Sequence, residues 1–358
     1  MESSGNVRRS PVFGVRRKPP VENPPPNIGV SNYGFIDNPV FSRTDDKLIV
    51  AILGGSFASQ TATYAKDSLI KALQPLNRDV AVLNLAIGGY KQPQQLFALS
   101  YLLALGAQID IVINIDGFNE VTLPPAENTP KKVFPVYPRG WYFIVNELND
   151  PIIVKNLAKI ETLDEDRINW ANLFSTGYLN KSLSLCLVWK AMDQQYERRI
   201  NEALLSLNDY KVDDPSSFTR NGPRFNFENE SDLYDYLATH WQRCSLQMKS
   251  ICEAQNIRYF HFLQPNQYYP GSKPMGKEEL KGSFYDDHVY RPSVVMGYPI
   301  FGQHGRELKK LGVSFHDLTM IFANVEEPLY ADTCCHLNSR GYGIIATKIG
   351  KTIVAEFD

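Results

Sequence analysis

An apolar run that ends in two glycines and a serine is the feature that most constrains the fold of this chain. Residues 48–53 (LIVAIL) are continuously apolar, as expected for a strand that is covered on both faces. Gly54-Gly55-Ser56 follows, and helix-prone sequence extends over 61–76. A strand that turns into a helix at a serine presents its hydroxyl beside unpaired N–H groups and the positive end of the helix dipole. The junction therefore indicates a candidate nucleophile.

Apolar strands alternate with helices over much of the chain. The sequence predicts strands at 48–53, 80–87, 109–115, 257–263 and 313–317. It predicts helices at 61–76, 92–105 and 340–355. Because strand and helix alternate, we expect an α/β fold with a parallel sheet and right-handed crossovers.

The alternation is interrupted in the middle of the chain. Helices are predicted at 183–206 and 232–255, so we expect a largely helical insertion at about 123–255. A second interruption, 264–300, is rich in Tyr, Pro and Gly and is expected to be irregular; it either walls a pocket or covers the core. The predicted organisation is a proline- and arginine-rich arm over 1–45 and a single domain over 46–357 that carries the insertion.

Composition excludes several classes of function. A net charge of −2 gives no global basic field for nucleic acid. No apolar run approaches the roughly 18 residues of a membrane span, and the arginines near the N-terminus precede no signal-peptide core. The compartment stays open, either cytoplasmic or exported or anchored if the N-terminus is incomplete, and so does the oligomeric state. Five scattered cysteines predict structural thiols rather than a disulfide framework or a zinc site.

The first three predicted strands each end in a distinctive turn. Ser56 follows the first strand, Gly88-Gly89 the second and Gly117-Phe118-Asn119 the third. If the strands are parallel neighbours, the three turns meet at one edge of the sheet. The backbone N–H groups of Ser56 and Gly89 and the side-chain amide of Asn119 would then be donors for an oxyanion.

A serine needs a base at neutral pH, and His336 is the best placed of six histidines. It lies just before the last predicted helix. Asp332 stands four residues earlier and could orient the ring of His336, leaving its other nitrogen to take the serine proton. Such a site requires no cofactor and no metal. His261 and His316 lie in predicted strands and are expected to be hydrogen-bonded core residues.

Together these signals resemble the SGNH (GDSL-type) hydrolases. The resemblance covers about 46–122 and 256–357 and implies a three-layer α/β/α sandwich, flavodoxin-like, with five parallel strands. It implies that Ser56 is the nucleophile, His336 the base and Asp332 its partner, while Ser56, Gly89 and Asn119 form the oxyanion hole. The implied activity is ester hydrolysis through an acyl-enzyme, on a small acyl group such as the acetyl of a saccharide.

The chain departs from the pattern of that family at three places. Gly55 stands where the family usually has Asp, and Asp332 precedes His336 by four residues instead of three. Contact between Asp332 and His336 still remains possible, because positions i and i+4 of a helical turn face the same way. Glu120 replaces the usual Asp after Asn119 and is interpreted as a loop anchor.

Other functions remain open at this stage. The same site could transfer the acyl group to a sugar hydroxyl, which would make the protein an O-acyltransferase. A catalytically silent carbohydrate-binding protein is a further alternative, since aromatic side chains in or near the insertion could stack on sugars: Trp141, Tyr142, Trp170 and Trp189. Ser56 could also be only a helix N-cap.

Overall fold

The computed structural model describes residues 7–10, 14–17, 31, 33–43, 46–141, 151–175, 182–209 and 218–357. The chain divides into two compact units. The smaller unit comprises Met1–Ser4 and Tyr142–Gly222, and the larger comprises Gly5–Trp141 and Pro223–Asp358. The sheet and all five predicted site residues belong to the larger unit.

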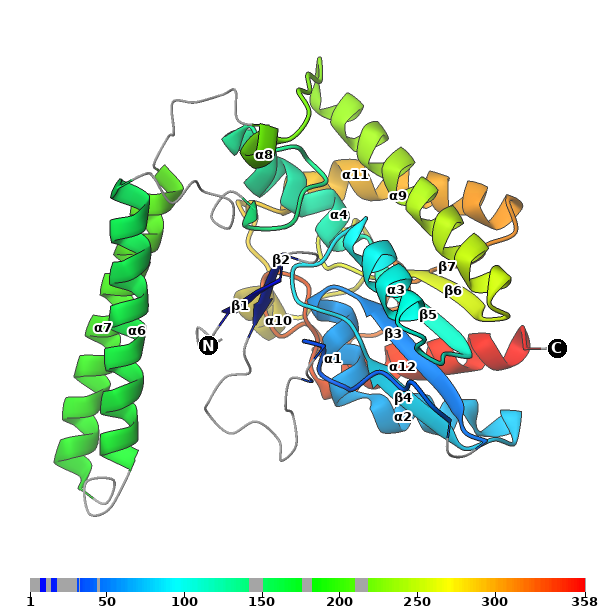
Figure 1. Cartoon of the computed structure of the whole chain (residues 1–358), viewed down its shortest axis with the longest axis horizontal. Helices are drawn as coiled ribbons and strands as arrows, with labels where there is room; N and C mark the ends of the chain where they lie inside the picture. The colour runs from blue at the N-terminus through cyan, green and yellow to red at the C-terminus, as the bar shows by residue number, and fades with distance from the viewer. Residues whose placement is uncertain are drawn as a thin grey trace. The chain divides into compact units, whose positions relative to one another are not determined.

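A parallel five-stranded sheet forms the centre of the larger unit (Figure 1). Its strands lie in the order β4 (Val80–Asn84), β3 (Leu48–Gly54), β5 (Ile111–Asp116), β6 (Arg258–Leu263) and β7 (Ser314–Asp317). The predicted five-stranded parallel sheet is therefore confirmed. The chain changes direction across the sheet between β3 and β5, and ligands of such sheets bind beyond the strand ends at this switch point.

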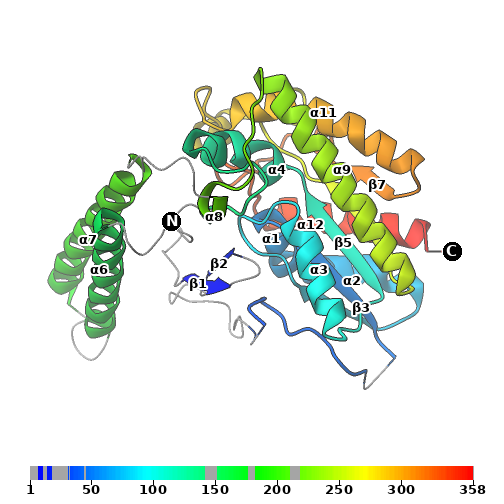
Figure 2. The same cartoon turned by 45° about the horizontal axis from the view of Figure 1, so that its top comes forward.

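Helices cover both faces of the sheet, and alternate residues of β3 point to opposite sides. Val50 and Ile52 face the side of α1 (Ser56–Tyr64), α2 (Lys66–Leu73) and α12 (Ser339–Ala355). Ile49 and Ala51 face the side of α3 (Gln94–Ala104), α9 (Glu230–Ala254) and α11 (Arg291–Lys310). Figure 2 shows α9 and α11 lying side by side. Burial of both faces explains why β3 reads as one apolar run.

The helix after β3 begins earlier than the prediction of 61–76. It starts at Ser56, because Gly55 takes an extended N-cap conformation, and it breaks at Ala65 before α2. Gly54 has a φ of +141°, and a Cβ there would lie 2.1 Å from the carbonyl oxygen of Ile115. Only glycine is compatible with this sharp turn. The turn leads directly into α1, and Ser56 is the first residue of that helix.

The irregular structure expected over 264–300 is wrong for its second half. Residues in this stretch form α10 (Lys277–Ser283) and the start of the long helix α11. The glycines of α11 and its Pro299 obscured the helical pattern in the sequence, although Pro292 near the start of α11 suits a first turn. The glycines allow close packing, because a Cβ at Gly305 would lie 2.2 Å from the ring of Phe315.

Residues 33–43, assigned to the arm by the sequence, belong to the larger unit and contribute to its core. Phe35 is buried in the core on the α3 side of the sheet. Asp37 accepts a hydrogen bond from the backbone N–H of Asn84, at 2.8 Å. Nearer the N-terminus, β1 (Val7–Ser10) and β2 (Gly14–Arg17) form an antiparallel pair that was not predicted.

The smaller unit contains a hairpin of two long helices, α6 (Pro151–Ser175) and α7 (Leu183–Asp209), followed by the short α8 (Phe218–Asn221) (Figures 1 and 2). Arg167 of α6 pairs with Asp193 and Glu197 of α7 at 2.5 and 2.9 Å. The ring of Trp189 stacks on that of Phe174. Sequence analysis predicted α7 but not α6. None of the described helices is long and apolar enough to cross a membrane.

The packing of α11 on β7 predicts the effect of a single methyl group. In Gly305→Ala the new Cβ would overlap the Phe315 ring, so we expect a loss of about 1–3 kcal/mol in the free energy of unfolding. Urea denaturation would measure it. Gly282→Ala is the matched control, because nothing lies within 4 Å of that Cβ position. Equal stability of the two variants would contradict the packing argument.

Candidate active site

Ser56, His336 and Asp332 lie in one hydrogen-bonded line at the carboxyl edge of the sheet. Nε2 of His336 is 2.8 Å from Oγ of Ser56, and Nδ1 of His336 is 2.5 Å from Oδ2 of Asp332. The His336 side chain is 11% exposed, whereas that of Asp332 is 43% exposed. One ring nitrogen thus faces the serine hydroxyl and the other faces a carboxylate, which is the arrangement required of a general base.

The carboxylate of Asp332 also organises the turn that carries His336. Its Oδ1 accepts hydrogen bonds from the backbone N–H groups of Cys334, Cys335 and His336 at 2.9, 3.1 and 3.1 Å. Burial opposes ionisation of Asp332, but the hydrogen bonds and charge of His336 and these backbone donors outweigh it and lower its pKa to about 2. The four-residue spacing therefore closes a compact ring in which aspartate and histidine remain in contact.

The segment after β6 holds this turn in place. Asn266 Nδ2 donates to the carbonyl of Cys334 at 2.9 Å, and Tyr268 Oη donates to that of Thr333 at 2.9 Å. Gln267 Nε2 donates to the carbonyl of Asp332 at 3.0 Å. These positioning residues were not predicted, because their partners are backbone atoms about 65 residues away along the chain.

The turns after β3, β4 and β5 meet beside Ser56. An ideal Cβ at Gly88 would lie 3.8 Å from Cβ of Ser56, and one at Gly55 would lie 2.3 Å from Nδ2 of Asn119. The φ of Gly89 is +81°, which favours glycine. Gly55 is therefore required for the close approach of Asn119, and this explains why the turn contains two glycines.

Glu120 connects the turn after β4 to the turn after β5. Oε1 accepts hydrogen bonds from the backbone N–H of Gln92, at 2.9 Å, and from Nε2 of Gln95. Oε2 accepts from the backbone N–H of Gly117 at 2.8 Å. Burial and the neighbouring Asp116 together raise the pKa of Glu120 to about 8, although hydrogen bonds from Gly117 and Gln95 oppose the rise. These contacts agree with the interpretation of Glu120 as a loop anchor.

An ion pair that the sequence did not reveal lies next to Gly89. The Arg139 side chain passes so close that its Cδ would be 3.0 Å from a Cβ at Gly89. Arg139 binds Glu127 through two contacts, of 3.0 and 2.8 Å. Lys91 holds the preceding loop, since its buried ammonium donates to the carbonyls of Pro135, at 2.6 Å, and Tyr137. Arg139 and Glu127 are 12 residues apart, so their pairing leaves no local pattern in the sequence.

The remaining histidines are engaged elsewhere. His261 is buried in β6 between Ser245 and Asp116, at 2.8 and 2.7 Å from their oxygens. His316 lies 3.2 Å from Glu356. His261 matches the expectation of a hydrogen-bonded core residue, whereas His316 is hydrogen-bonded to Ser314 but is partly exposed and does not lie in the core. Trp170 and Trp189 belong to the helical hairpin, and Tyr142 lies outside the described residues.

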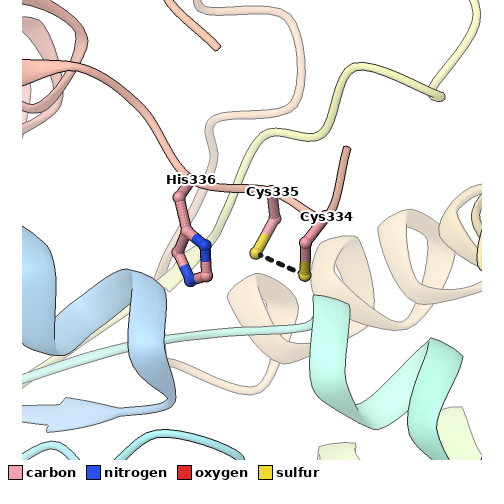
Figure 3. A group of neighbouring side chains, drawn as sticks. All are labelled: Cys334, Cys335 and His336. Carbon is pink, nitrogen blue, oxygen red and sulfur yellow. Dashed lines mark hydrogen bonds between the residues drawn. The ribbon is translucent and has the colours of Figure 1, made fainter. Parts of the chain in front are cut away.

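Cys334 and Cys335 lie directly beside His336 (Figure 3). Their sulfur atoms and a ring nitrogen of His336 are all within 4.8 Å of one another, which makes them the one group with metal-ligating potential found in the described part of the chain. Asp286, Asp287 and His288, which are adjacent in the sequence, do not form such a group there. Cys244 and Cys252 are buried in α9, as structural thiols.

Comparisons with known proteins add little to this geometry. No family model and no curated protein matches the chain. One similar solved structure is a candidate acylhydrolase from Bacteroides fragilis NCTC 9343, with 12% identity and a TM-score of 0.40, covering 89% of this chain and 92% of the other. Another is a gut microbial diltiazem-metabolizing enzyme, with 10% identity and a TM-score of 0.41, covering 87% and 48%. Likenesses of this size establish neither family nor activity.

The lowered pKa of Asp332 predicts how stability depends on pH. As pH falls below about 4, the unfolded state takes up this proton first, so the folded state loses stability until about pH 2. In Asp332→Asn this contribution is absent. We therefore expect the stability difference between wild type and variant to shrink on acidification from pH 5 to pH 2.5, as measured by urea midpoints. A constant difference would show that the carboxylate is not stabilised by its partners.

Proposed function

We propose that this protein is a serine ester hydrolase of the SGNH type that acts through an acyl-enzyme. The 2.8 Å contact between Oγ of Ser56 and Nε2 of His336 carries the proposal. The N-cap of α1 is Gly55 and not Ser56, and a cap would need neither a histidine at its hydroxyl nor an aspartate behind that histidine. Both are present here, and they come from the opposite end of the chain. This pairing supports chemistry at Ser56 rather than a capping role.

In the proposed first step, Ser56 attacks the ester carbonyl. Its proton passes to Nε2 of His336, while the carboxylate of Asp332 stabilises the imidazolium that forms. The bond between the carbonyl carbon and Ser56 Oγ forms as the carbonyl π bond becomes an oxyanion. Collapse of this intermediate expels the alcohol, which takes the proton from His336. Water then attacks the acyl-enzyme in the same way, with His336 again taking and returning a proton, and the acid is released.

The developing oxyanion would be bound by three donors. The backbone N–H of Ser56 lies in the first turn of α1, where helical N–H groups lack partners within the helix. The Gly89 N–H and the Asn119 amide complete the proposed set. One N–H of that amide donates to the carbonyl of Tyr90 at 2.7 Å, which fixes the side chain, and its second N–H can point to the substrate.

The proposed substrate carries a small acyl group, such as an acetyl on a saccharide. This part of the proposal follows from the resemblance to SGNH hydrolases. The paired Arg139 and Glu127 beside Gly89 offer both donors and acceptors to hydroxyl groups next to the ester, which is compatible with a sugar.

A fluorophosphonate probe tests whether Ser56 is an activated nucleophile. We expect an adduct on Ser56 in the wild type, located by peptide mass spectrometry, and none in His336→Ala. Ser56→Ala should lower ester hydrolysis by about 10³-fold or more, since the nucleophile is lost. Ser59→Ala, one helical turn further along α1, is the matched control and should keep the label. An unlabelled wild type without esterase activity would favour a carbohydrate-binding role.

The contact between Gly55 and Asn119 predicts a coupled pair of variants. Asn119→Ala should reduce kcat by about 10²–10³-fold if the amide binds the oxyanion. Gly55→Ala should cause a similar loss, because its Cβ would displace Nδ2 of Asn119. The double variant should then be little worse than either single variant. Fully additive losses would show that Gly55 and Asn119 act independently.

A further inference from the structure

Two adjacent cysteines directly precede the proposed base. Sγ of Cys334 lies 3.5 Å from Sγ of Cys335, and both side chains project to the same side of the turn as His336 (Figure 3). Cys334 is partly exposed, whereas Cys335 is buried. The proposed hydrolytic mechanism uses neither thiol, so their placement against His336 requires a separate explanation.

The two thiols differ in their readiness to ionise. The S–H of Cys335 hydrogen-bonds to Cys334 and lowers its pKa; burial opposes this, and the charges of His336 and Arg139 add to the lowering. Burial raises the pKa of Cys335 well above its ordinary value. Cys334 is therefore the thiol suited to attack an electrophile, and Cys335 is the protonated neighbour held within reach of it.

We propose that Cys334 and Cys335 form an oxidative modification site that takes a peroxide and closes to a disulfide beside His336, reversibly switching off the hydrolase. The site rests on the geometry of the two sulfur atoms and the exposure of Cys334, whereas its effect on turnover rests on the proposed function. The adjacent thiols, one of them accessible, supply both the attacking and the resolving sulfur within a single turn.

The chemistry balances with hydrogen peroxide as oxidant. The Cys334 thiolate attacks one peroxide oxygen, so that an S–O bond forms, the O–O bond breaks and hydroxide leaves to become water. The Cys335 sulfur then attacks the sulfenic sulfur of Cys334. The S–S bond forms, the S–O bond breaks, and a second water leaves with the Cys335 proton. Two thiols are oxidised by two electrons, and one peroxide is reduced to two waters.

Closure of this disulfide must deform the turn from Asp332 to His336. The sulfur atoms have to approach from 3.5 Å to about 2.05 Å. The Cα atoms of adjacent residues are only about 3.8 Å apart, less than most disulfides span, so the bond is strained and readily reduced. The N–H groups of both cysteines bind Oδ1 of Asp332, and Asn266 binds the carbonyl of Cys334. Moving this backbone displaces Asp332 and, with it, His336.

The same three side chains could instead bind a thiophilic cation such as Zn²⁺, through two sulfurs and one imidazole nitrogen. We favour the disulfide because both ring nitrogens of His336 already have partners, Asp332 and Ser56. A metal would have to replace one of them. The experiment below therefore keeps metals chelated during oxidation and examines Zn²⁺ in a separate arm.

The test treats the full chain with a small molar excess of hydrogen peroxide in the presence of EDTA. We expect the peptide that contains both cysteines to lose about 2 Da, as a disulfide requires. Hydrolysis of a small ester should fall at least about tenfold, as expected when catalytic groups are misplaced. Dithiothreitol should restore both the mass and the rate.

Two variants separate this site from general oxidative damage. Cys334→Ser lacks the attacking thiolate and should keep its own untreated rate after peroxide. Cys186→Ser, at an exposed cysteine of the helical hairpin, is the matched control and should be inactivated like the wild type. The proposal is overturned if no 2 Da loss occurs, if Cys334→Ser is equally inactivated, or if only Zn²⁺ inhibits and EDTA reverses it. Should the protein lack esterase activity, the mass change still decides the disulfide.

Discussion

The carboxylate of Asp332 is the group on which the rest of the site depends. One oxygen binds the imidazole of His336, and the other gathers three consecutive backbone N–H groups. A single side chain thus defines the turn and orients the ring within it. Because the carboxylate is partly exposed, its ionised form keeps some contact with water, and the internal donors compensate for the part that is buried.

The sheet provides the second half of the arrangement. β3 and β5 are parallel neighbours, and the order in which strands are added to the sheet reverses between them. The turn with Ser56 and the turn with Asn119 therefore open towards the same space. These two turns lie so close together that there is no room for a side chain at Gly55. The glycine that distinguishes this turn from the usual Gly-Asp-Ser is therefore a consequence of packing against Asn119, and the proposed nucleophile is unaffected by it.

Much of this could be predicted because the informative residues lie at strand ends. Apolar runs located the five strands, the first three as continuous runs, and glycine, serine and asparagine after those three indicated the candidates Ser56, Gly89 and Asn119. The four-residue spacing left contact between Asp332 and His336 possible, but it did not predict the backbone N–H groups that Asp332 binds. Other features leave no local signal. The long helix α11 is rich in glycine and contains Pro299, while the pairing of Arg139 with Glu127 and the bonds from Asn266 and Tyr268 join residues distant in sequence. Such contacts depend on tertiary packing rather than on periodicity.

Ser56 and His336 lie 280 positions apart in the sequence, and this separation affects how the protein matures. Their contact exists only once the C-terminal helix α12 has docked on α1, where Tyr342 donates to Gln60 at 2.7 Å and packs on Phe57. During synthesis Ser56 emerges long before His336, its proposed base. A polypeptide that ends before His336 would lack this contact, so under the proposed function reactivity at Ser56 would report that the segment with His336 has packed against α1.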